Sequence, residues 1–83
     1  MTHALVTVSR GIIDQVTFYD SAALAIRALA DFVKGMNAQD DNAAIFSSEG
    51  LVANAKDFLD ENEQFILNED LLNEVEASDN THP

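Results

Sequence analysis

The fold of this chain is decided by residues 21–36, SAALAIRALADFVKGM, which form the clearest helical segment of the sequence. Asp20 and Ser21 are good N-cap residues, and the run behind them is rich in helix formers, with no glycine or proline before Gly35. Because glycine is a common helix stop signal, the helix is predicted to end near residues 34–36. An apolar stripe at three- and four-residue spacing needs a partner surface, and it comprises Ala22, Ala25, Ile26, Leu29, Phe32 and Val33.

Two strands are predicted before this helix. Residues 4–9 alternate in the manner of a strand and are rich in β-branched side chains, and residues 12–19 resume the pattern after an Arg10-Gly11 turn. The two runs are therefore expected to pair as a hairpin. Since a two-stranded hairpin is marginal on its own in water, it must pack on the helix.

The hairpin has a second face, to which Leu5, Ile13 and Tyr19 are assigned. Unless further strands or another helix cover this face, its side chains would form an exposed apolar patch. Such a patch is typical of a dimer or partner interface. Leu5, Ile13 and Tyr19 are therefore a candidate surface for a homodimer or for a partner protein.

A third strand and an ambiguous stretch follow the helix. Residues 43–48 are a short apolar run that predicts a strand. Residues 51–55 fit either a strand that pairs back across a Glu49-Gly50 turn, echoing the first hairpin turn, or the beginning of a helix. A helix over at least residues 52–62 is favoured because helical spacing is kept by Leu51, Ala55, Phe58 and Leu59.

The end of the chain predicts a short helix and a tail. Residues 64–67 fit a fourth strand or a helical turn, and Asn68 is placed to cap a helix whose apolar side is Leu71, Leu72 and Val75. So short a helix is unstable alone, so these side chains must dock on the body or on another molecule. Residues 77–83 have nothing to bury and are expected to be a disordered tail.

These elements predict a small α+β domain over residues 1–76. Its order is ββαβα-like: an N-terminal hairpin, a long helix, a third strand and one or two further helices. The length of 83 residues fits one domain, and an apolar content of 47% argues against global disorder in spite of a net charge of −11.

The negative charge is concentrated in the last third of the chain. From Asp57 onward there are nine acidic residues and no lysine or arginine. Such a segment repels nucleic acid and anionic membranes and attracts a basic protein surface, although acidic residues also serve solubility alone. The residues predicted to form the partner-binding acidic face are Asp57, Asp60, Glu61, Glu63, Glu69, Asp70 and Glu74.

The sequence lacks the residue sets of common catalytic and metal centres. It has no cysteine, and its histidines, His3 and His82, lie near the two ends. Asp60-x-Asn62-x-Gln64 begins like a calcium loop, but the glycine and the closing glutamate of that motif are replaced by Phe65 and Leu71. We therefore expect no catalytic residue, no metal site and no cofactor.

The sequence thus predicts a non-catalytic protein-interaction module, an accessory or regulatory subunit that binds a basic surface of a larger protein or complex. Two alternatives stay open: an inhibitor of the phage anti-defence type that mimics nucleic acid, and a homodimeric structural protein. Neither a secretory signal pattern nor an apolar run of about 18 residues is found, so a cytoplasmic location without membrane contact is expected.

Overall fold

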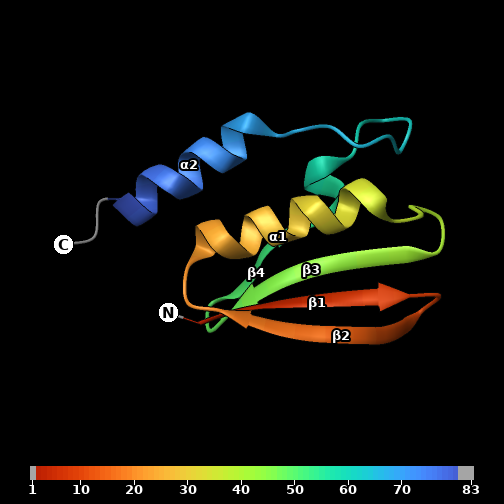
Figure 1. The fold of residues 1–83 in the computed structure, drawn as a ribbon, viewed down its shortest axis with the longest axis horizontal. Helices are drawn as coiled ribbons and strands as arrows, with labels where there is room; N and C mark the ends of the chain where they lie inside the picture. Colours follow the sequence, from red (N-terminus) through yellow and green to blue (C-terminus); the bar gives the residue numbers. More distant parts are fainter. Residues whose placement is uncertain (1, 81–83) are drawn as a thin grey trace.

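The strands of the protein form one antiparallel sheet in the order β2-β1-β3-β4 (Figure 1). The computed structural model describes residues 2–80. The central strands β1 and β3 come from distant parts of the chain, because α1 connects the first hairpin to the second. The elements in chain order are β1 (His3–Ser9), β2 (Ile12–Tyr19), α1 (Ala22–Gly35), β3 (Asp41–Ser47), β4 (Gly50–Asn54), the short 3-10 helix η1 (Ala55–Phe58) and α2 (Glu69–Asn80).

The first hairpin and the long helix agree with the prediction. Arg10 and Gly11 have φ values of 54° and 80°, which a two-residue type I′ hairpin turn requires. The Ser21 hydroxyl caps α1 by accepting a hydrogen bond of 3.3 Å from the Leu24 amide. The α+β class, with a hairpin followed by a long helix and a further strand, is confirmed.

The core lies between α1 and one face of the sheet. The helix buries Ala25, Ile26, Leu29, Ala30 and Val33. The apolar side chains that the sheet and η1 contribute to this core are Leu5, Ala43, Ile45, Ala53, Ala55 and Phe58.

The face predicted from Leu5, Ile13 and Tyr19 does not exist as one surface. Leu5 is 5% exposed and lies in the core, and Tyr19 packs against the core on the same side of the sheet. Ile13 lies on the opposite face, because a bulge between Thr7 and Val8 shifts the register of β2 by one residue and pairs Ile13 with Val8. The assignment of hairpin faces was therefore inverted at Leu5 and Tyr19.

The predicted helix over residues 52–62 is wrong, and the alternative hairpin is present. Gly50, with a φ of 113°, ends the turn after β3, and β4 pairs with β3. A reciprocal cap then ends the strand: the Asn54 amide donates to Asp57 Oδ2 at 2.9 Å, and Asn54 Oδ1 accepts from the Lys56 amide at 2.9 Å. The helical spacing in this stretch comes from the single turn of η1.

The chain then returns over α1 and ends in α2 (Figure 1). Residues 64–67 form no strand, although Phe65 makes an isolated bridge with Leu59 and its ring stacks on Phe58 at 6.4 Å. Asn68 caps α2 as predicted, its Oδ1 accepting from the Leu71 amide at 3.0 Å. The apolar side chains predicted to dock, Leu71, Leu72 and Val75, pack against the core.

The last helix extends past residue 76, where the predicted domain ends. The helix α2 continues through Asn80, so residues 77–80 are helical and not a disordered tail. The remainder of the predicted tail, 81–83, lies outside the described residues. The helix continues because residues 76–80 extend a segment that is already anchored on α1 by its first two turns.

The contact between α1 and the sheet predicts a large difference between two leucines of the same helix. Leu29→Ala is expected to lower the free energy of unfolding by about 2–5 kcal/mol, since Leu29 is fully buried. Leu24→Ala is the matched control, and it should change stability by less than about 0.5 kcal/mol because Leu24 is 54% exposed. Urea unfolding followed by circular dichroism measures both values. Equal losses would contradict the packing of α1 described here.

Candidate functional site

The acidic residues of the last third are distributed over η1, the loop after it and α2. In Figure 1 this loop and α2 lie on the side of α1 that faces away from the sheet. The backbone that carries most of the predicted acidic residues therefore runs along the outer side of α1, whereas Asp57 belongs to η1 and Glu63 lines a cleft beside β3. Of the seven residues of the predicted acidic face, Asp60 is half-buried and the other six are exposed, namely Asp57, Glu61, Glu63, Glu69, Asp70 and Glu74.

Two of these carboxylates hold the local backbone in place. Asp57 closes the cap of η1 through its bond with the Asn54 amide. Asp60 Oδ1 accepts hydrogen bonds from the amides of Asn62 at 2.8 Å and Gln64 at 2.9 Å, which fixes the turn that leads to Phe65. Asp57 and Asp60 therefore have structural roles that their residue types alone did not reveal.

The other five carboxylates are available to solvent. Glu61, Glu63, Glu69, Asp70 and Glu74 are exposed and make no side-chain hydrogen bond or ion pair with any residue that the structure describes. Glu69 and Asp70 stand in the first turn of α2, where negative charge also stabilises the helix dipole. We name these five residues the acidic surface.

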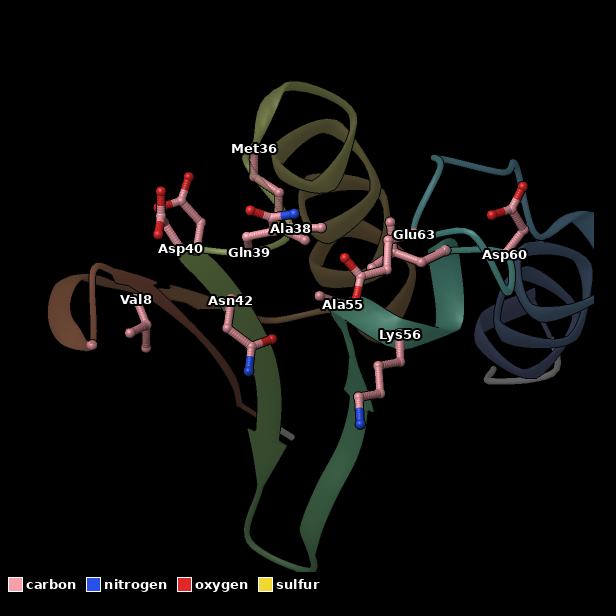
Figure 2. A pocket seen from close by; sticks show the side chains of 13 residues that line it. Val8, Met36, Ala38, Gln39, Asp40, Asn42, Ala55, Lys56, Asp60 and Glu63 are labelled. Atoms are coloured by element: carbon pink, nitrogen blue, oxygen red, sulfur yellow. The ribbon is translucent and has the colours of Figure 1, made fainter.

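A cleft of about 600 Å³ opens beside η1 (Figure 2). It exists because β4 ends at Asn54, opposite Ala44, so the beginning of β3 has no neighbour on that side. Its mixed lining includes Met36, Leu59, Lys56, Asp40, Asp41 and Asp60.

Three of the four carboxylates that line this cleft accept hydrogen bonds from its loops, and the fourth, Glu63, does not. Asp41 Oδ2 accepts from the Asn37 amide at 3.0 Å, and Asp40 Oδ2 accepts from the Asn37 side chain at 3.2 Å. Asp60 is held by its own turn. Within the part of the chain that the structure describes, no three His, Cys, Asp or Glu side chains converge as metal ligands.

The sheet has one face that no other element of residues 2–80 covers, since α1, η1 and α2 all lie on the other side or at the edge (Figure 1). The pairing of the strands defines this open sheet face in three cross-strand rows. The rows are Phe18, Ala4, Phe46 and Leu51; Val16, Val6, Ala44 and Asn54; and Ile13, Val8 and Asn42.

The three rows of the open sheet face are apolar apart from two asparagines, and the basic side chain of Lys56 borders them beside Ala44, Leu51 and Asn54. Phe18 is 67% exposed, and Leu51 and Ile13 are exposed to a similar degree. Sequence reasoning missed this surface because it assigned Leu5 to it in place of Val16 and Phe18. The signal was the alternation Ala4, Val6 and Val8 itself, which predicts an apolar face but not which side α1 covers.

His3 was expected near a loose end but lies in β1 and is 8% exposed. Its Nδ1 atom is buried without a hydrogen-bond partner. It points to the helix-covered side of the sheet, as Leu5 and Thr7 do. His3 is thus part of the packed layer, where sequence position alone suggested a mobile terminus.

The two kinds of carboxylate predict different effects of the same change. Asp57→Ala should lower the free energy of unfolding by about 1 kcal/mol, because the Asn54 amide loses its capping acceptor. Glu61→Ala, four residues further on, should leave stability within about 0.5 kcal/mol. Urea denaturation of the two variants under the same conditions measures the difference, and an unaffected Asp57 variant would refute the structural role of this residue.

Comparison of the chain with family models, with curated proteins and with solved structures gave no match. Among the helices of residues 2–80, none has the length and apolarity needed to cross a membrane. Function is therefore inferred from the acidic surface, the cleft and the open sheet face.

Proposed function

We propose that this chain is a small, non-catalytic protein-interaction module that binds a basic surface of a larger protein through its acidic surface. In this role it serves as an accessory or regulatory subunit. The observation that carries the proposal is the segregation of charge. Nine acids and no base follow residue 56, and the five residues of the acidic surface belong to the loop and to α2, whose backbone lies on the side of α1 that faces away from the sheet.

The acidic surface is held on a firm support. Leu71, Leu72 and Val75 fix α2 on the body of the protein, so Glu74 on the same helix occupies a defined position. Glu61 and Glu63 belong to a turn that the two hydrogen bonds to Asp60 hold in place. A partner therefore meets carboxylates whose backbone is already ordered, which lowers the entropy lost on binding.

The chemistry of this surface favours a protein partner with exposed lysine and arginine side chains. Carboxylates repel the phosphates of nucleic acids and of anionic lipids, whereas opposite charge steers a basic protein into contact and speeds its association. The charges of the acidic surface act over about 8 Å at physiological ionic strength. Binding should therefore weaken steeply as salt is added.

Neutralising three carboxylates tests the proposal. Glu61→Gln, Glu63→Gln and Glu74→Gln together change the net charge from −11 to −8 and avoid the residues with capping or helix-dipole roles. Affinity capture from host extract, followed by titration of the purified partner, should show binding about tenfold weaker than that of the unaltered chain. The partner retained by the unaltered chain should carry a basic surface and should elute as salt is raised.

A matched control separates the position of the charges from their number. Asp14→Asn, Asp20→Asn and Glu49→Gln also give a net charge of −8, but these exposed residues lie outside the last third of the chain. This control should bind the partner almost as well as the unaltered chain. If both triple variants lose affinity equally, or if neither loses it, the acidic surface is not the binding site.

A further inference from the structure

We infer that the open sheet face is the interface with a second copy of this chain. The inference goes beyond the proposed function, because it concerns the opposite side of the molecule and needs no basic partner. It predicts a two-fold dimer in which two sheets pack face to face. Each copy would then present its acidic surface outward.

The charge distribution favours a second copy as the occupant. None of the eleven residues in the three rows carries a charge, on a chain whose net charge is −11. Lys56 borders the rows at the end of β4, so two such faces can meet over the rows themselves without burying a charged group there, whereas a charged partner surface would have to bury one. The apolar rows of one copy are thus suited to contact the same rows of a second copy.

Repulsion between two acidic chains does not oppose this arrangement. A helix packs about 10 Å from the layer beneath it, so α2, which lies behind α1, is roughly 20 Å from the sheet. With two sheets about 10 Å apart, the two acidic surfaces would be separated by about 50 Å. This is several times the screening length of about 8 Å, so the acidic surfaces of the two copies hardly interact.

The relief of the open sheet face is also suited to a two-fold contact, which requires one patch to hold both a projection and a hollow. The ring of Phe18, 67% exposed, is the projection. The hollow lies above Ala4, between Phe18 and Phe46, in a groove of about 500 Å³ that continues to Ser47 and Ser48. Small residues in the central strands, Ala4 and Ala44, beside large ones in the same rows let two such faces interlock.

Sedimentation of the full chain tests the inference. At about 100 µM, well above a micromolar Kd, the unaltered chain should sediment with twice the 9.0 kDa mass of the monomer. Phe18→Glu should weaken the dimer by about 30-fold or more, because it removes the projecting ring and buries a charge within an apolar contact. Leu24→Glu is the control: Leu24 is 54% exposed but lies on α1, so its dimer should persist. A monomer of the unaltered chain, or equal dissociation of both variants, overturns the inference.

A second measurement needs no substitution. In a mixture of carbon-13-labelled and unlabelled wild-type chains, isotope-filtered NMR should show contacts between copies from Val16, Phe18, Phe46 and Leu51. Contacts confined to the outer backbone edge of β2 would show pairing through that edge and would overturn the inference.

The dimer and the proposed partner binding can fail separately. The dimer should keep its mass in 1 M NaCl and in the triple Gln variant of the acidic surface, because neither condition touches the open sheet face. Dissociation in either condition overturns the sheet-to-sheet dimer and leaves the partner proposal standing. Loss of partner binding in the triple Gln variant with an intact dimer would instead support the proposed function and leave the dimer inference standing.

Discussion

The packing of α1 on one face of the sheet is the contact on which the rest of the structure depends. Ile26 and Leu29 of the helix and Ile45 of the sheet are fully buried there, so this layer excludes water over its whole centre. The four-stranded sheet is covered on this face by a single long helix, α1. Because α2 packs on the back of α1, its apolar side chains extend the same core and leave the other face of the sheet uncovered.

This one-sided packing gives the molecule two unlike surfaces. The loop and α2 carry the acidic surface, and the three rows of the open sheet face carry only apolar and amide side chains. An acidic surface and an uncharged one use different forces: the first acts through screened Coulomb attraction, and the second through removal of apolar area from water. The proposed partner binding and the proposed dimer would therefore respond differently to salt.

The sequence predicted the elements with the strongest local signals. The cap at Ser21 and the apolar stripe specified α1, Arg10-Gly11 specified the first hairpin, and Asn68 specified the beginning of α2. Capping and turn residues act within a few positions of the chain, so their effect can be deduced without knowledge of the fold. The concentration of acidic residues in the last third was visible because it is a property of the sequence itself and does not depend on the fold.

The features that failed depend on contacts between distant residues. The side of β1 with Ala4, Val6 and Val8 is the more apolar one, yet α1 covers the side with Leu5, so alternation alone could not decide which side faces the helix. The bulge between Thr7 and Val8 moved Ile13 to the other face. The turn of η1 gave residues 55–59 a helical spacing although β4 precedes it. Because of these two errors the open sheet face was not predicted. It could be recognised only once the order of the four strands was known.

The central claim is that α1 covers the side of the sheet that carries Leu5 and Ile45. Methyl NOEs measured on the wild-type chain test it directly, because such contacts are seen only between groups that lie within a few ångströms of each other. The structure predicts NOEs from Ile26 and Leu29 of α1 to the methyl groups of Leu5 and Ile45. NOEs from these helix residues to Val6 and Val16 would contradict it, since they would place α1 on the face described here as open.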